Sequence, residues 1–291
     1  MSQPSHRCHP NRSKPMQGFS SSFLILFYQI ALGGLFALAA TPFHEIERAF
    51  YKSTAGVLYV IALIGLWGRS SFYWQSLAQQ FSWSISLESF FHVSFLVSFS
   101  CYMLSLWVEW QLFRARSFAA SILAGVAGLL LSAQSFYSAG IISVETMVYP
   151  TTFFLSSMLL GSVTVGMLMG HWYLIDTGQS LAPFIRLYKF FVVTLIAQCV
   201  IFLLAPWALY HLGNSQSIAG LERLWQRHAT LAVTRVAVGQ VAPLILSWMI
   251  WRTLQIPHTM AATGLFYIAL LGVFVGEILG RQILALTSLP F

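Results

Sequence analysis

The run TTFFLSSMLLGSVTVGMLMGHWYL, residues 151–174, indicates the kind of environment in which this chain folds. It contains no Asp, Glu, Lys or Arg, and about 20 apolar residues in a helix are enough to cross a bilayer. Seven more runs of this kind occur at residues 19–42, 53–70, 88–112, 117–139, 188–210, 229–252 and 260–287. The sequence therefore predicts an all-α membrane protein, a bundle of about eight transmembrane helices joined by short loops.

The composition of the whole chain leads to the same prediction. Of the 291 residues, 57% are hydrophobic and 8% are charged, whereas soluble domains have about 25% charged residues. So few charged groups cannot cover a water-exposed surface, which excludes soluble enzymes, coiled coils and disordered proteins. A transmembrane β-barrel is excluded as well, because its strands would be alternating segments of about 10 residues.

The charged residues flank the apolar runs and do not indicate a nucleic-acid surface. The 15 Lys and Arg outnumber the 8 Asp and Glu, but most stand singly between runs. In that position they set topology and meet anionic lipid head groups, so the bilayer is the expected partner and nucleic acid is not. The three cysteines are far apart and form no CxxC motif, and no metal-binding spacing occurs, so no metal site is predicted.

The first 15 residues, MSQPSHRCHPNRSKP, differ from everything that follows. They are polar and contain three Pro, so we expect a disordered tail at 1–15 and a single eight-helix transmembrane domain at 16–291. Met16 begins a segment typical of the start of a membrane protein. We therefore hypothesise that translation starts at Met16, the alternative being Met1.

Basic residues also bear on orientation. We call the side reached by the ends of the odd-numbered spans face A and the opposite side face B. Face A carries seven basic residues: Arg48, Lys52, Arg114, Arg116, Arg186, Lys189 and Arg252. Face B carries four, to which the tail adds three: Arg69, Arg223, Arg227 and Arg281, then Arg7, Arg12 and Lys14. Without the tail, face A is predicted to be cytoplasmic, in the inner (cytoplasmic) membrane of a cell.

Small residues recur at a spacing of four in two of the runs. They are Gly166 with Gly170, and Gly272 with Gly276 and Gly280. Residues at this spacing share one helix face, where backbones can approach closely. We expect tight packing inside the bundle, with a homodimer seam as the alternative.

A first group of candidate site residues lies on face A. The run LMGHWYLID places His171, Trp172 and Tyr173 near the membrane–water boundary, and His44 follows the first span on the same side. A quinol releases protons with its electrons, and histidine changes protonation near pH 7, so these residues suit a quinone head group. The alternatives are an aromatic belt, which gathers at this depth in any helix, and a haem ligand.

A second group lies on face B and includes polar and ionisable residues within the spans: Glu88, His92, Arg235, Gln240, Glu277 and Arg281. Glu277 and Arg281 are spaced i, i+4 in the order that favours an ion pair. Arg235, about two turns into its run, needs a carboxylate, and Glu277 is the expected partner. Such residues are costly in a membrane and indicate function by default, as a proton path or head-group pocket. The alternative is a charge pair that only fastens the last two spans.

Histidine pairs leave a b-type haem open. His44 with His171, or His92 with His228, could supply two ligands on one face. The spacing permits either pair and demands neither, so quinone is the favoured cofactor and b-type haem the less favoured one.

The run GEILGR, residues 276–281, resembles the last helix of dimethyl-sulfoxide-reductase-type anchor subunits. These belong to the wider NrfD and polysulfide-reductase membrane-subunit superfamily. The resemblance covers about a dozen of 291 residues and carries over only Glu277 and Arg281. It implies about eight or more helices that pass electrons between the quinone pool and an iron–sulfur partner, usually without haem. The HWYL run, residues 171–174, resembles an uncharacterised bacterial membrane protein family, which implies no function.

Taken together, these features predict a quinone-interacting anchor subunit of a respiratory redox complex, with no soluble catalytic domain of its own. The expected partners are an iron–sulfur or cytochrome subunit. Whether the chain counts as an enzyme stays open, since its part would be that of a non-catalytic subunit of an oxidoreductase. The alternatives are a structural or assembly protein of the membrane, and a transporter or permease.

Overall fold

The computed structural model describes residues 18–41, 43, 45–79, 83–108, 110–137, 143–176, 178–256 and 258–291. These residues fold into α1 (Phe19–Ala39), α2 (Arg48–Gln79), α3 (Trp83–Ser105), α4 (Gln111–Gln134), α5 (Val144–Ile175), α6 (Ala182–Leu212), α7 (Ser215–Arg227), α8 (Ala229–Val236), the π-helix η1 (Ala237–Val241), α9 (Ala242–Gln255) and α10 (Thr259–Thr287). The predicted tail, Met16 and His44 lie outside the described residues.

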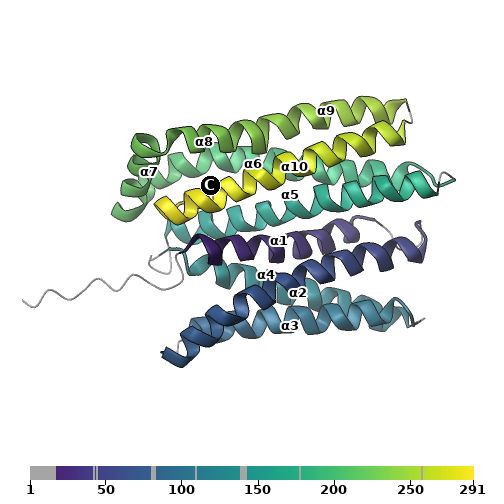
Figure 1. Ribbon diagram of the computed structural model, residues 1–291, viewed down its shortest axis with the longest axis horizontal. Helices are drawn as coiled ribbons and strands as arrows, with labels where there is room; N and C mark the ends of the chain where they lie inside the picture. Colours follow the sequence, from purple (N-terminus) through teal and green to yellow (C-terminus); the bar gives the residue numbers. More distant parts are fainter. Residues whose placement is uncertain are drawn as a thin grey trace, which may run out of the picture.

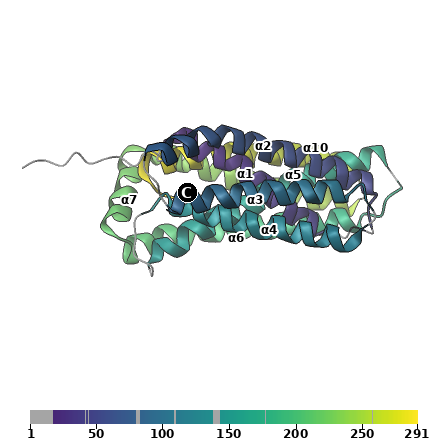
Figure 2. The same cartoon turned by 90° about the horizontal axis from the view of Figure 1, so that it is seen from below.

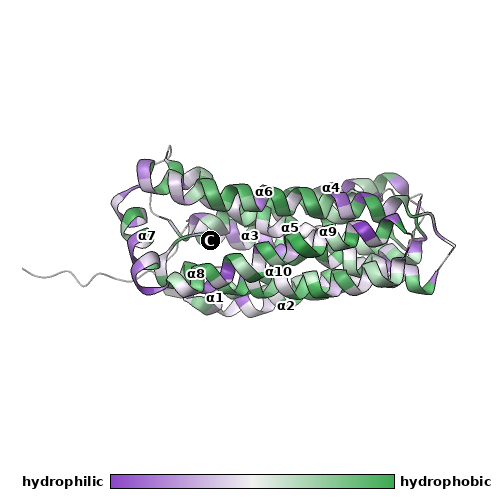
Figure 3. Ribbon diagram, turned by 90° about the horizontal axis from the view of Figure 1, so that it is seen from above, coloured by the Kyte–Doolittle hydropathy of each residue, from purple (hydrophilic) through white to green (hydrophobic). Residues whose placement is uncertain are grey.

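Eight helical segments are long and apolar enough to cross a membrane, and α8, η1 and α9 together form one of them. This confirms the prediction of an all-α, multi-pass membrane protein with eight spans. In Figure 3, hydrophobic residues dominate the middle of the bundle and hydrophilic residues gather towards its ends. That distribution is the one expected of helices whose central length faces lipid.

The spans run side by side along the long axis and form two groups of four (Figures 1 and 2). Helices α1 to α4 pack in a ring, and α5, α6, the α8–α9 segment and α10 pack in a second ring. Helices α1 and α5 are the most buried spans and lie between the two groups. Their contact therefore joins the two halves of the bundle.

Glycine makes this central contact possible. A Cβ added to Gly161 of α5 would lie 1.8 Å from the carbonyl carbon of Gly33 in α1. A Cβ added to Gly33 would lie 1.7 Å from the backbone oxygen of Ser157. Only residues without a side chain allow two helix backbones to approach this closely.

The glycines singled out by their spacing also pack inside the chain. A Cβ on Gly166 or Gly170 would lie 2.5 Å from Phe266 or Thr263 of α10, and one on Gly276 would lie 2.4 Å from the Cα of Gly239. The expectation of tight packing within the bundle is therefore confirmed. These glycine faces are covered by the chain's own helices.

Two features of the second half depart from the predicted pattern. The segment between the sixth and seventh spans was predicted to be a loop, but it contains a short helix, α7, which lies across one end of the bundle (Figure 1). The seventh span also departs from a regular α-helix just before Pro243, where Ala237–Val241 form the π-helix η1. Proline lacks an N–H and clashes with the preceding turn, and the wider π turn accommodates it.

Candidate functional site

The predicted pairing of Arg235 with Glu277 is present in the structure. Arg235 Nη2 in α8 donates to Glu277 Oε1 in α10 at 2.7 Å, and both side chains are at most 3% exposed. Gln198 Nε2 in α6 donates to the same carboxylate oxygen at 2.7 Å. One carboxylate thus joins three helices, and we call this group with its neighbours the Glu277 cluster.

Arg281 adds a second guanidinium to the Glu277 cluster. Its Nη2 lies 3.8 Å from Glu277 Oε2, one helical turn away, and donates to Gln29 Oε1 of α1 at 2.5 Å. The guanidinium lies over the ring of Phe153, 4.5 Å from its centroid. Gln29 also donates to the backbone oxygen of Phe153 at 2.7 Å, which ties the cluster to the seam between α1 and α5.

The edge of the Glu277 cluster between α6 and the α8–η1 segment carries neutral polar and aromatic groups. Gln240 Nε2 in η1 donates to Gln198 Oε1 at 3.3 Å, and Cys199 Sγ donates to Gln240 Oε1 at 3.1 Å. The ring of Phe202 lies over the Arg235 guanidinium, 4.7 Å from the centroid. Cys199 and Phe202 are only half-buried, so this edge lies next to the lipid-facing surface.

Glycines make room for the Arg235 side chain. A Cβ added to Gly239 would lie 2.2 Å from Arg235 Nη1, and one added to Gly276 would lie 2.7 Å from the same nitrogen. A Cβ added to Gly280 would lie 3.1 Å from Arg235 Nε. Among the described residues, neither of these two nitrogens has a hydrogen-bond partner, nor does Arg281 Nε. The cluster therefore has buried N–H donors to spare, an arrangement typical of sites that bind an acceptor.

The Glu277 cluster lies closer to face B than to face A. Glu277 is ten residues from the end of α10 at Thr287 and eighteen from its start at Thr259. At about 1.5 Å per residue these separations are about 15 Å and about 27 Å. The cluster is therefore inside the membrane, towards face B.

A small cavity adjoins the Glu277 cluster on its inner side. Its volume is about 10 Å³, room for roughly one water molecule. Its walls come from α5, α10 and the segment after α10: Thr152, Phe153, Ser156, Glu277, Gly280, Arg281, Leu284, Pro290 and Phe291.

A comparable cluster lies in the first half of the bundle, and sequence reasoning missed its pairing. Arg69 of α2 forms a short ion pair with Glu88 of α3, and both side chains are 3% exposed. The same carboxylate oxygen accepts from Tyr73 at 3.1 Å and from Ser132 of α4 at 2.7 Å. Arg69 Nη1 also donates to the backbone oxygen of Ser21 in α1, so this Glu88 cluster touches all four helices of its half.

The two clusters differ in charge and in saturation. The Glu88 cluster holds one guanidinium and one carboxylate, whereas the Glu277 cluster holds two guanidiniums and one carboxylate. Each Arg69 nitrogen has a partner, whereas three arginine nitrogens of the Glu277 cluster have none among the described residues. The Glu88 cluster has the features of a structural brace, and the Glu277 cluster has donors left over.

His92 lies beside the Glu88 cluster and is fully buried. Its Nδ1 contacts the backbone oxygen of Glu88 at 2.8 Å, and its ring packs on Tyr28 with centroids 4.2 Å apart. Because a carbonyl only accepts, Nδ1 must carry the proton. His228, the other member of that predicted pair, caps α8 in the second half of the bundle.

The HWY run on face A is spread over different surroundings. His171 is exposed, Trp172 packs on Phe50 with ring centroids 6.0 Å apart, and Tyr173 donates to the backbone oxygen of Ser180 at 2.6 Å. Consecutive helical residues point in directions about 100° apart, so these side chains do not converge. His44 lies outside the described residues, and a site on face A stays a prediction.

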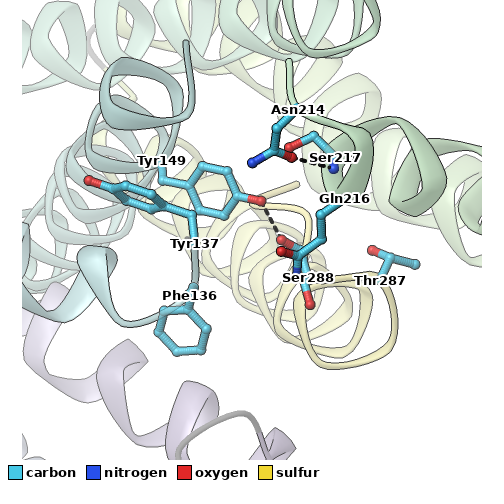
Figure 4. A pocket seen from close by; sticks show the side chains of 8 residues that line it. All are labelled: Phe136, Tyr137, Tyr149, Asn214, Gln216, Ser217, Thr287 and Ser288. Atoms are coloured by element: carbon cyan, nitrogen blue, oxygen red, sulfur yellow. Dashed lines mark hydrogen bonds between the residues drawn. The ribbon is translucent and has the colours of Figure 1, made fainter. Parts of the chain in front are cut away.

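Face B is closed by a polar junction between α5, α7 and the residues after α10. Glu145 accepts from the Asn214 backbone at 2.7 Å and from the Ser217 hydroxyl at 2.9 Å. Tyr149 donates to the backbone oxygen of Ser288 beside a second cavity of about 10 Å³ (Figure 4). These bonds hold α7 across the end of the bundle.

Burial changes the count of charges that bears on orientation. Arg69 and Arg281, counted on face B, are buried in ion pairs, which leaves Arg223 and Arg227 as its exposed basic residues outside the tail. None of the seven basic residues assigned to face A is buried. The excess on face A is therefore larger than the sequence count indicated.

Comparison with known proteins adds no family to this description. No protein-family model matches the chain, and no curated protein is similar to it. The eight long apolar helices of the described residues identify the chain as an integral multi-pass membrane protein.

Proposed function

We propose that this chain is the quinone-interacting membrane subunit of a redox complex and that the ring binds at the Glu277 cluster. The observation that carries the proposal is the surplus of buried donors around one carboxylate, next to a half-buried edge between α6 and α8–η1. A quinone is dissolved in the lipid bilayer, so it would approach the Glu277 cluster through the edge between α6 and α8–η1.

The chemistry of the Glu277 cluster fits each part of a quinone. Its carbonyl oxygens are acceptors, Gln240 supplies a donor at the edge, and the spare N–H groups of Arg235 lie deeper, beside Gly239, Gly276 and Gly280. Its flat ring suits the aromatic side chain of Phe202, which already lies over Arg235. Oxidation of a quinol releases two electrons, which pass to the cofactor of a partner subunit, and two protons. Glu277 would take the protons one at a time, releasing the first towards face B before it accepts the second.

The partners follow from the chemistry and from the resemblance of residues 276–281 to dimethyl-sulfoxide-reductase-type and NrfD-like anchor subunits. The electrons need an acceptor cofactor on another chain, an iron–sulfur or cytochrome subunit. Within the described residues, the loops between spans are short and form no domain that could hold such a cofactor. We propose that the chain is located in the inner (cytoplasmic) membrane of the cell.

Quinone binding by purified protein in detergent tests the proposal. Ubiquinone-1 and menadione are added as probes, excess is removed, and retained quinone is extracted and quantified per chain. We expect saturable retention of at least one probe. Gln240→Leu keeps the ion pairs and removes a donor, which should weaken binding by about tenfold.

Two further variants make the assignment specific. Glu277→Gln should weaken binding as well. Glu88→Gln removes a buried carboxylate of the first half of the bundle and should leave the quinone affinity of the folded protein unchanged. Equal losses for Gln240→Leu and Glu88→Gln would contradict the site. Absence of saturable retention by the wild type would contradict the function and favour a structural, assembly or transport role.

A further inference from the structure

A row of polar side chains follows one side of α5 from face B to the Glu277 cluster. It consists of Glu145, Tyr149, Thr152 and Ser156, each at most 3% exposed. Their spacing of three or four residues places them on one helix face, over a length of about 16 Å. Polar groups inside a membrane are costly and indicate function by default, so this row is a candidate route between the cluster and face B.

The cavity beside the Glu277 cluster lies at the deep end of this row, and we call it the inner cavity. Its volume of about 10 Å³ suits one water molecule, and its walls include Thr152, Ser156, Glu277 and Arg281. Arg281 Nε has no hydrogen-bond partner among the described residues, so a water here can accept from Arg281 and donate to Glu277. The terminal carboxyl group of Phe291 is the further ionisable group on these walls.

A second space of about 10 Å³, which we call the outer cavity, lies at the face B end of the row. The Tyr149 hydroxyl points across it towards Ser288 (Figure 4). Its walls also include Ser217, whose hydroxyl donates to Glu145 at 2.9 Å, and Gln216, which is exposed. A water in the outer cavity is therefore close to the solution at face B.

The two cavities lie about one helical turn apart. Thr152 lines the inner cavity and Tyr149 the outer one, and on α10 the corresponding residues are Leu284 and Thr287. One turn rises about 5.4 Å, and two successive O–H···O bonds span about the same distance. A hydroxyl group of the row can therefore bridge a water in one cavity to a water in the other.

We propose that the two cavities hold water and that, with the hydroxyl groups of Thr152 and Tyr149, these waters form the proton exit from Glu277 to face B. The exit rests on the proposed function, in which Glu277 takes the quinol protons. At each step one oxygen loses an O–H bond and the next oxygen gains one, until the proton reaches Glu145 and the solution. The electrons leave separately, to the cofactor of the partner subunit.

Radiolytic footprinting of the purified protein in ¹⁸O-labelled water tests for the waters without any quinone. Hydroxyl radicals formed from a bound water modify the aromatic ring beside it, even where that ring is buried. We expect Phe153 and Tyr149, which line the cavities, to gain ¹⁸O several times faster than Phe99 and Phe191, which are equally buried and line neither. Equal labelling of the two pairs would overturn the proposal.

A matched pair of variants tests the movement of protons. Thr152 and Thr164 are both buried in α5, and each donates to the carbonyl oxygen four residues earlier at 2.7 Å, but Thr164 lines neither cavity. Thr152→Val and Thr164→Val should both retain quinone like the wild type. Proton transfer along the route should slow by at least about tenfold in Thr152→Val alone.

Pulse radiolysis in formate solution measures that rate, because it reduces menadione bound to the purified chain and a pH indicator records the two protons taken up per quinol. Uptake follows the exit route in reverse. Equal rates in the two variants would overturn the proton exit. A wild type that gains ¹⁸O at Phe153 but retains no quinone would refute the proposed function while the waters remain.

Discussion

Substitution of Gly161 by alanine should separate the two halves of the bundle. The added Cβ would lie 1.8 Å from the carbonyl carbon and 2.1 Å from the next backbone nitrogen of α1, and backbone cannot move aside as a side chain can. Reaching an ordinary contact of about 3.4 Å requires a separation of about 1.6 Å. That movement breaks the bonds from Gln29 to Phe153 and from Ser157 to Gln29, at 2.7 and 2.9 Å.

The energetic terms of this substitution oppose each other but do not cancel. Overpacking contributes about 3 kcal/mol of destabilisation, and two hydrogen bonds inside a membrane protein contribute about 0.6 kcal/mol each. Alanine favours the helix over glycine by about 1 kcal/mol. The expected net loss in the free energy of unfolding is about 3 kcal/mol.

Unfolding with sodium dodecyl sulfate in mixed micelles, followed by circular dichroism, measures this loss. Gly264→Ala is the matched control, because a Cβ at Gly264 of α10 meets nothing within 4 Å. That variant should be as stable as the wild type or slightly more so. If Gly161→Ala were as stable as Gly264→Ala, the close contact of α1 with α5 would be refuted.

Three other predictions concern the brace, the orientation and face A. Glu88→Leu should lower the free energy of unfolding by about 3–5 kcal/mol because it leaves Arg69 buried and unpaired, and a wild-type unfolding curve for this variant would be inconsistent with the brace. In a background without native cysteines, Arg223→Cys should react with an impermeant maleimide on intact cells and Lys189→Cys should not, since the basic excess predicts that face A is cytoplasmic; the reverse labelling would overturn the orientation. His171→Ala should leave quinone retention unchanged because His171 is exposed near the face A end of α5, whereas the Glu277 cluster lies towards face B, and a tenfold loss would move the site to face A.

The spans could be predicted from the sequence because long apolar runs have few alternatives to membrane helices. Their ends were less well determined. The predicted second span ended at residue 70, one residue after Arg69, whereas α2 continues to Gln79 and places Arg69 well inside the helix. Arg69 was therefore counted as a loop charge, and its pairing with Glu88 was missed.

The Glu277 cluster was predicted in part. The i, i+4 spacing of Glu277 and Arg281 and the lone charge of Arg235 pointed to an interaction that the structure contains. Gln29 and Gln198 were missed, although each is a single amide within an apolar run, which is a usable signal. Gln29 and Gln198 reach the cluster only because their helices pack next to α10, and the sequence of one span does not show which helices will be its neighbours.

Helix α7 could not be recognised from hydropathy. Its thirteen residues are mostly polar, and it buries one narrow side, with Leu221 and Leu224, against the end of the bundle. Its start depends on Asn214, whose side chain accepts from the Ser217 backbone at 2.8 Å, and on Glu145 from a distant helix. Tertiary contacts of this kind are invisible in a scan for membrane spans.

The measurement that tests the central claim most directly is the mapping of a photoreactive azidoquinone cross-linked to the purified wild-type protein. Labelling should concentrate in α6 and in the α8–η1 segment, around Cys199, Phe202 and Gln240, and an excess of unmodified quinone should suppress it. Labelling concentrated on the face A end of α5 near Trp172, or labelling that excess quinone does not suppress, would contradict a quinone site at the Glu277 cluster.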